Sequence, residues 1–127
     1  MGFEKLDWLS VPAGIRKHAI TIPYFDFINF TNLKKLYVAG GEPTAMIEFY
    51  DFLDKCIDNN QTNFDLLINT NGTKLSNRLK TQLTKFKTVS FIVSIDGYNE
   101  LNHYVRWPSD WNTIVDNVHY LYNNFST

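Results

Sequence analysis

The stretch "LYVAGGEPTAM", residues 36–46, decides the fold because it joins an apolar strand to a helix through two glycines. Its first half is a short apolar run of the kind that lies buried in a sheet. Gly40 and Gly41 end that run, and Pro43 restricts the backbone before a helical pattern begins. Glu42 therefore stands in a turn directly after a strand, where a ligand could meet its carboxylate.

Strand–helix units repeat along the chain from residue 34 onward. Short apolar or β-branched runs predict three strands, at residues 34–40, 64–69 and 88–95. Each run is followed by apolar residues three or four positions apart, which predicts amphipathic helices, at residues 46–57, 75–86 and 111–125. We expect Ser76 near the start of the second helix and Asp110 at the N-cap of the third.

The alternation of strands and helices predicts an α/β fold with a parallel sheet. The third run, "TVSFIVSI", is nearly continuously apolar, which suits a parallel strand covered on both faces. Residues 1–33 are predicted to be an N-terminal helical segment packed on the sheet, with Thr21 and Pro23 near a helix start. Residues 34–127 then hold the three β/α units of one domain.

Three strands are few for this architecture, because an α/β barrel closes with about eight and an open doubly wound sheet has about five or six. The chain therefore looks like part of a larger sheet, or like one that pairs with another chain through its exposed sheet edges.

Composition and charge exclude several classes of partner. The chain has 127 residues, with 12 basic and 13 acidic side chains and no block of like charge, so neither nucleic acid nor an anionic membrane surface is an expected partner. No apolar run is long enough to span a bilayer and the N-terminus lacks a secretory pattern, so we expect a cytoplasmic protein. Cys56 is the only cysteine, which rules out an intrachain disulfide, and its position on an apolar helix face predicts a buried thiol.

Turn residues and polar side chains follow each predicted strand, as "AGGEPT", "NTNGT" and "SIDG". Each stretch alone is explained by an ordinary turn, but together they mark the strand ends at which parallel α/β folds bind ligands. Neither a P-loop nor a G-x-G-x-x-G motif is present, and Glu42 would repel a phosphate. Glycine backbone and a carboxylate favour a cationic group such as an ammonium.

Read together, these motifs resemble the radical S-adenosylmethionine (SAM) superfamily, in particular its branch with SPASM or twitch auxiliary domains. The resemblance covers about residues 33–122 and rests on Gly-Gly-Glu-Pro, Asn-Thr-Asn-Gly-Thr, Ser-x-Asp-Gly and a following Tyr-Val-Arg, in this order and at plausible spacing. It implies a partial (β/α) barrel, with about three parallel strands alternating with helices, that is the central part of a barrel that binds SAM.

The resemblance also implies a role for individual residues. Gly40, Gly41 and Glu42 would bind the amino group of the SAM methionine moiety, with Pro43 fixing the turn. Asn71 and Thr73 would line the cofactor cleft. Ser94 and Asp96 correspond to positions around the SAM ribose, and Arg106 matches an arginine that pairs with the SAM carboxylate. An acid for the ammonium and a guanidinium for the carboxylate are what a zwitterion requires.

One departure from the family concerns its iron–sulfur chemistry. Members hold a four-iron–four-sulfur cluster with three thiolates of a Cys-x3-Cys-x2-Cys loop, and reduction of SAM at this cluster yields a 5′-deoxyadenosyl radical. This chain has no such loop. We therefore expect it to be inactive on its own.

Three interpretations stay open. The chain is a fragment of a radical SAM enzyme, from a truncation, a split gene or a partial reading frame. Alternatively it is a self-standing, non-catalytic binding or scaffold module derived from the same barrel. A third interpretation is an unrelated α/β domain that binds a carbohydrate or a nucleotide. The substrate cannot be read from the motifs.

Overall fold

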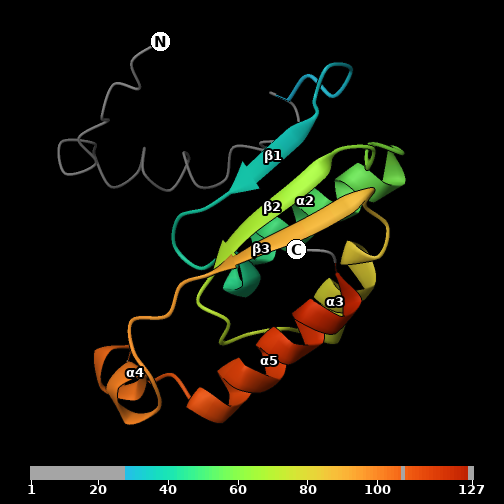
Figure 1. The fold of residues 1–127 in the computed structure, drawn as a ribbon. Helices are drawn as coiled ribbons and strands as arrows, with labels where there is room; N and C mark the ends of the chain where they lie inside the picture. Colours follow the sequence, from blue (N-terminus) through green and yellow to red (C-terminus); the bar gives the residue numbers. More distant parts are fainter. Residues whose placement is uncertain (1–27, 107, 126–127) are drawn as a thin grey trace, which may run out of the picture.

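The computed structural model describes residues 28–106 and 108–125 (Figure 1). It contains three strands, β1 (Lys35–Val38), β2 (Asp65–Thr70) and β3 (Thr88–Val93). A 3-10 turn and four α-helices alternate with them, namely η2 (Pro43–Ala45), α2 (Ile47–Asp58), α3 (Asn77–Leu83), α4 (Glu100–Val105) and α5 (Trp111–Asn124). None of the helices in this described part of the chain has both the length and the apolar composition needed to cross a membrane.

The strands form a parallel sheet in the order β1-β2-β3. Leu36 lies opposite Leu66, and Ile68 lies opposite Phe91. Such parallel neighbours need a crossover connection, which α2 and α3 supply. The prediction of a parallel α/β fold is thereby confirmed at this level, and the sheet formed by the described residues does not close on itself.

The core lies between the helices and one face of the sheet. Side chains alternate between the two faces of a strand, and in β2 every second residue is buried. The buried apolar side chains of β2 and β3 pack with α2 and α3, in a cluster that includes Leu53, Leu66, Ile68, Leu79, Leu83 and Val89. Helix α5 covers the same face, because the ring of Phe91 in β3 meets that of Phe125 with centroids 6.0 Å apart.

The opposite face of the sheet is open in the part of the chain that the structure describes (Figure 1). Tyr37 in β1 is 52% exposed and Ile92 in β3 is 46% exposed, and both point away from the helices by strand alternation. The expectation that the apolar run 88–95 is covered on both faces is therefore wrong for the described residues. Within the described residues the helices cover one face of the sheet only.

The predicted helix starts are largely confirmed. The Ser76 side chain accepts a hydrogen bond from the Leu79 N–H at the start of α3, and Asp110 caps α5 through the Thr113 N–H. Two short elements were not predicted, η2 and α4. The predicted N-terminal helical segment lies mostly outside the described residues, and its residues 28–33 form a turn closed by a bond from the Leu33 N–H to the Phe30 carbonyl.

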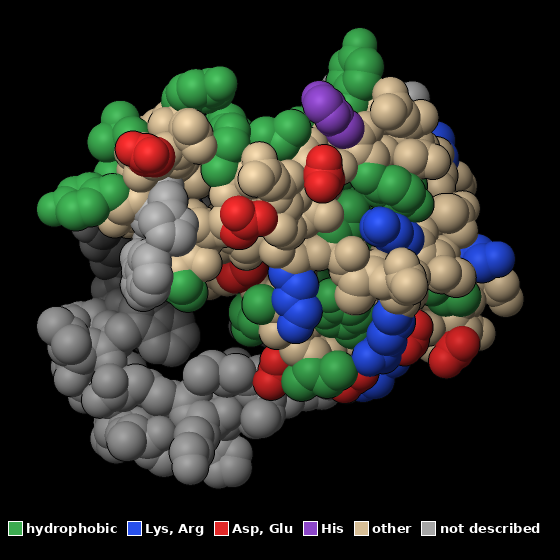
Figure 2. All heavy atoms as spheres, turned by 90° about the horizontal axis from the view of Figure 1, so that it is seen from below, with side chains coloured by type: hydrophobic (Ala, Val, Ile, Leu, Met, Phe, Trp, Pro, Cys, Tyr) green, Lys and Arg blue, Asp and Glu red, His purple; other side chains and the backbone are tan. Residues whose placement is uncertain are grey.

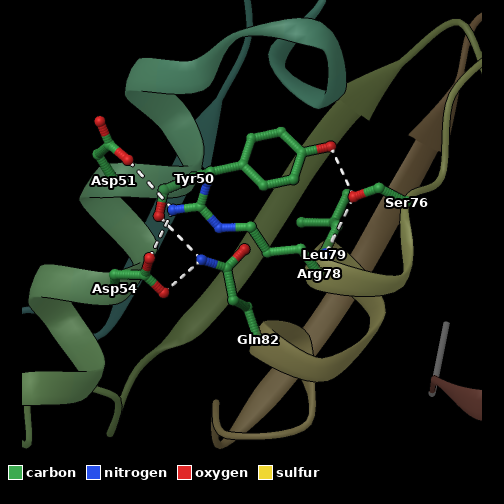
Figure 3. A network of polar contacts seen from close by, with 7 residues as sticks. All are labelled: Tyr50, Asp51, Asp54, Ser76, Arg78, Leu79 and Gln82. Atoms are coloured by element: carbon green, nitrogen blue, oxygen red, sulfur yellow. Dashed lines mark hydrogen bonds and ion pairs between the residues drawn. The ribbon is translucent and has the colours of Figure 1, made fainter.

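A polar network joins α2 and α3 on the outer surface (Figure 3). The Arg78 guanidinium contacts Asp54 at 2.6 Å and Asp51 at 3.1 Å. The side-chain amide of the buried Gln82 donates to Asp54 at 2.6 Å and to the Tyr50 carbonyl at 2.9 Å. The hydrogen bond from Arg78, followed by that from Gln82, lowers the pKa of Asp54 below its ordinary value. The network thus links α2 to α3, with the buried Gln82 side chain as its inner member.

Candidate functional site

The polar segments that follow the three strands lie at one end of the sheet, because the strands are parallel and point the same way, toward α4 (Figure 1). Ligands of parallel α/β folds bind at this carboxyl end of the strands. The candidate site is therefore built from three loops, which start after Val38, Thr70 and Val93.

The loop after β1 exposes its backbone. Gly40 has φ of 100° and Gly41 has φ of 58°, values that side chains disfavour. A Cβ added at Gly40 would meet nothing within 4 Å, whereas one at Gly41 would lie 3.6 Å from the sulfur of Met46. The peptide groups around Gly40 are thus open to a ligand, as the sequence predicted for a glycine turn.

Glu42 holds the ends of β1 and β2 together. Its Oε1 accepts hydrogen bonds from the Thr44 hydroxyl at 2.6 Å, the Thr44 N–H at 3.3 Å and the Thr70 hydroxyl at 2.6 Å. Its Oε2 accepts one from the Asn71 N–H at 2.7 Å. Thr44 and Thr70 are buried, at 1% and 3% exposure, so these bonds are largely shielded from water.

The two carboxylate oxygens of Glu42 differ in the number of hydrogen bonds that they accept. Oε1 already has three donors, while Oε2 has one from the described residues. Because an ionised carboxylate offers about four acceptor sites, two on each oxygen, Oε2 can still accept a hydrogen bond from a ligand. Glu42 therefore combines a structural role at the strand ends with acceptor capacity on one oxygen.

The loop after β2 is closed by its own side chains. The Asn71 carboxamide oxygen accepts from the Thr73 N–H at 2.9 Å and the Thr73 hydroxyl at 2.6 Å. Gly72 between them has φ of 74°, and its carbonyl accepts a bond of 2.8 Å from the Asn117 side chain in α5. Both predicted residues of this loop thus shape the turn and bond to each other.

The loop after β3 begins at Ser94, whose hydroxyl donates to the Asn69 side-chain oxygen at 2.9 Å. The Asn69 side-chain N–H in turn donates to the Tyr37 hydroxyl at 3.2 Å. These three polar side chains, one from each strand or its end, form what we name the polar row. It lies on the open face of the sheet, whereas the Glu42 contacts involve Thr70 and Thr44 on the helix side.

Asp96 and Arg106 form an ion pair between Asp96 Oδ2 and Arg106 Nε. The Nε atom is shielded from solvent and lacks the alignment of a hydrogen bond, so the contact is a close charge pair. Asn102, which is fully buried, accepts from the Asp96 N–H at 3.4 Å, and its backbone carbonyl accepts from the Arg106 N–H at 2.9 Å. The loop and α4 are thus one folded unit with Arg106 at its end.

Helix α4 places apolar side chains beside this ion pair. Leu101, Tyr104 and Val105 are exposed, Tyr104 at 84%, and Figure 2 shows hydrophobic side chains projecting over α4. This explains why α4 was not predicted, since a helix of six residues with its apolar side chains in solvent has no buried stripe.

The structure brings several predicted residues into direct contact. Glu42 is hydrogen-bonded to Asn71, and Asn71 is hydrogen-bonded to Thr73. Asp96 forms an ion pair with Arg106. The structure shows no contact between the Glu42 group and the Asp96–Arg106 pair among the described residues. Four contributors were not singled out from the sequence: Thr44, Thr70, Asn69 and Tyr37. All four stand inside the quoted stretches, so a closer inspection of those stretches could have found them.

The residues present do not fit an iron–sulfur cluster. Cys56, the only cysteine of the chain, is fully buried in the core on α2, as predicted, and burial raises its pKa to about 12. Clusters need thiolate ligands, which such a thiol does not supply. Within residues 28–106 and 108–125, no three His, Cys, Asp or Glu side chains are grouped so that they could hold a metal ion.

Comparisons with known proteins give no match for this chain, whether against protein-family models, curated proteins or solved structures.

Proposed function

We propose that this chain is the SAM-binding part of a radical-SAM-type barrel, with its strand ends holding the methionine moiety of SAM. The main support is the hydrogen bond of 2.7 Å that the Asn71 N–H donates to Glu42 Oε2, because it links the Gly-Gly-Glu-Pro motif directly to the Asn-Thr-Asn-Gly-Thr motif. The open backbone at Gly40 beside the same carboxylate supports an ammonium site.

Arg106 supports the complementary half of the site. The Arg106 side chain is 30% exposed and that of its partner Asp96 is 46% exposed, so a ligand carboxylate could compete with Asp96 for the guanidinium. Ser94 and Asp96 remain proposed as residues near the ribose. A singly covered parallel sheet also supports the proposed partial barrel, since barrel helices all lie outside one sheet.

This chain's own residues bind and orient in this proposal, and no radical step follows from them. The protein groups at the strand ends would hold a zwitterion by Glu42 Oε2 and Arg106. The turn at Asn71 would keep Glu42 in place, and Asp96 would keep Arg106 in place. A cluster would have to be supplied by cysteines other than Cys56, since that thiol is buried and protonated.

Titration calorimetry with SAM and with decarboxylated SAM tests the site. We expect Arg106→Gln to weaken SAM binding only about two- to fivefold, because the ligand carboxylate replaces Asp96 at Arg106 and a partly exposed ion pair is worth about 0–1 kcal/mol. The same change should leave the affinity for decarboxylated SAM unaltered, since that ligand has no carboxylate. Arg78→Gln, which removes a guanidinium from the α2–α3 network instead, is the matched control.

Glu42→Gln examines the ammonium half, because it keeps the size of the side chain and removes its charge. We expect weaker binding of both ligands, as both carry the amino group. Absence of SAM binding at millimolar concentration would refute the proposal, provided that circular dichroism shows a folded chain.

A second candidate is a non-catalytic scaffold module, and the internal bonding of Glu42 favours it. The four hydrogen bonds that it accepts need no ligand to explain the carboxylate. Weak SAM binding that neither Arg106→Gln nor Glu42→Gln alters would support this function instead.

We also propose that the chain associates through its sheet edges, with another copy or with the remaining barrel strands. Within the described residues, β1 and β3 each pair on one side only. Since the Ser94 N–H bonds the Thr70 carbonyl, alternation directs the backbone groups of Val93, Phe91 and Val89 to the free side. Sedimentation velocity should show association that grows with concentration; a monomer at all concentrations would contradict it.

A further inference from the structure

The sheet of the described residues has two edges, and the edge of β3 is the better suited to pairing with another strand. β3 has six residues without a charged or proline side chain, whereas β1 has four, begins at Lys35 and follows Lys34. Short edge strands and lysines protect against pairing. The backbone groups of Val89, Phe91 and Val93 point to the free side of β3, about 6.6 Å apart, which is the rise of two strand residues. Another extended segment repeats its donors and acceptors at the same spacing.

Helix α5 carries apolar side chains that β3 does not bury. It contacts α3 through Tyr120, because the Lys80 ammonium lies 4.1 Å from the centroid of the Tyr120 ring. Tyr122 follows two residues later and is therefore turned about 200° away from Tyr120 around the helix. Tyr122 is 71% exposed, and Val115 on the same side is half-buried. Since α3 connects β2 to β3, the side of α5 that faces away from α3 is the side of the free β3 edge.

A cavity of about 340 Å³ lies where a strand beside β3 would begin. It is lined by the start of β3 and by the ends of α3 and α5, with Leu83, Val89 and Phe125 as apolar members. In both complete units of the sheet a helix returns the chain to the amino end, where the next strand starts, and α5 returns to the same end. Lys87 is the one charged side chain among the described residues that line the cavity, and it is exposed.

We propose that the slot between the β3 edge and α5 binds an extended peptide segment of another chain, parallel to β3. Its first residue is acidic and lies beside Lys87, and its alternate apolar side chains pack against Val115 and Tyr122. The side chains between them lie on the open face beside Ser90 and Ile92, so threonine suits these positions. The parallel direction follows from α5, which packs on β3 as the crossover helices α2 and α3 pack on their strands. The inference rests on the proposed association through the sheet edges and names its edge, its partner and its direction.

The probe is an acetylated and amidated peptide that alternates valine with threonine, with glutamate in place of its first valine. Its titration into the full chain, followed by NMR, should shift the backbone amide signals of Val89, Phe91 and Val93 and leave those of β1 unchanged. Methylation of the peptide nitrogens tests the direction of binding. In this sheet a strand bonds its predecessor through residues of the open face, as Ser94 does with Thr70. N-methylation at the threonines should therefore abolish binding, whereas N-methylation at the valines should not.

Lys87→Gln tests the cavity end of the slot. We expect it to weaken binding of the probe about two- to fivefold, the effect of an exposed ion pair. A second peptide, with its glutamate at the last position, should bind equally to the parent and to Lys87→Gln, because that carboxylate lies at the other end of β3. Lys85→Gln is the matched control, since Lys85 is exposed but does not line the cavity.

Tyr122→Ser tests the α5 side of the slot. We expect about a three- to tenfold loss of probe affinity, because the apolar side chains of the probe lose a surface on which they are buried. Since Tyr122 is exposed, the substitution leaves the core intact, which circular dichroism verifies. Tyr104→Ser is the matched control, because Tyr104 is also exposed but lies on α4.

Three results would overturn the proposal. The first is binding that survives N-methylation at the threonines, which an antiparallel strand or a ligand without strand pairing would give. The second is binding that neither Lys87→Gln nor Tyr122→Ser weakens, and the third is the absence of shifts in β3 at millimolar peptide. Sedimentation velocity separates this inference from the association on which it rests. A chain that self-associates but does not bind the probe at β3 refutes only the inference, whereas a monomeric chain that binds the probe refutes only the pairing of copies.

Discussion

Glu42→Ala would remove the carboxylate that ties the end of β1 to the end of β2. The hydroxyls of Thr44 and Thr70 would lose their acceptor, and so would the Asn71 N–H. Thr44 and Thr70 are almost fully buried, so water reaches their hydroxyls poorly, whereas Asn71 is half-buried and its N–H can be hydrated. Two buried donors therefore set the cost of this substitution.

The expected loss of unfolding free energy is about 2–4 kcal/mol. Each buried donor left unsatisfied costs about 1–3 kcal/mol, and rotation of the two hydroxyls recovers part of the sum. A loss of this size is a large share of the roughly 5–15 kcal/mol by which a domain is stable. Urea denaturation followed by circular dichroism measures it as a lower midpoint at an unchanged slope.

Two further variants make this result specific. Glu48→Ala is the control, because Glu48 is exposed in the first turn of α2 and its charge is worth only about 0.3–1 kcal/mol there. Glu42→Gln should fall between the parent and Glu42→Ala, since its carbonyl oxygen can serve the hydroxyls while its NH₂ group opposes the Asn71 N–H. If Glu42→Ala lost no more stability than Glu48→Ala, the description of Glu42 as a link between strand ends would be wrong.

Two other predictions concern titratable groups. The hydrogen bond from Arg78 lowers the pKa of Asp54 from its ordinary value of 3.8. The ionised carboxylate therefore stabilises the fold above about pH 3.8, and this contribution is lost as the pH falls through the lowered pKa. Arg78→Gln should make the stability measured by urea denaturation fall less steeply at acid pH, and an unchanged dependence there would contradict the pairing. Burial raises the pKa of Cys56 from its ordinary value of 9.0 to about 12, so the stability of the fold should decrease as the pH rises above 9.0, where the thiol of the unfolded chain ionises. A thiol reagent should label Cys56 at the rate at which the chain unfolds. Fast labelling of the folded chain would contradict the burial of Cys56.

The elements that were predicted correctly depend on local patterns. Ser76 caps α3 because a hydroxyl accepts an N–H three residues later, which needs no information from the rest of the fold. The three strands were placed within about two residues, since each apolar run ends at a glycine or a polar turn. Helix α4 was missed because its helical spacing carries no buried stripe, and residues such as Tyr104 meet solvent.

The site was predicted in part, for a related reason. The position of Glu42 after a strand follows from its neighbours in sequence, but its bond to Thr70, 28 residues away, depends on how β1 lies against β2. The polar row depends on the same register, because Tyr37, Asn69 and Ser94 meet only when three strands are aligned. Contacts of this kind are set by the packing of the sheet, which a single sequence does not specify.

The two charged groups of the proposed zwitterion site are in different states before any ligand arrives, and this bears on how they could bind. Glu42 keeps its internal bonds when an ammonium approaches Oε2, so that half of the site is already organised and needs no rearrangement. Arg106 must exchange the Asp96 carboxylate for the carboxylate of the ligand, which replaces one ion pair by a similar one. Such an exchange contributes little net affinity, since Asp96 must then be hydrated again. The ammonium half would therefore provide most of the affinity, while Arg106 would mainly fix the orientation of the ligand at the strand ends.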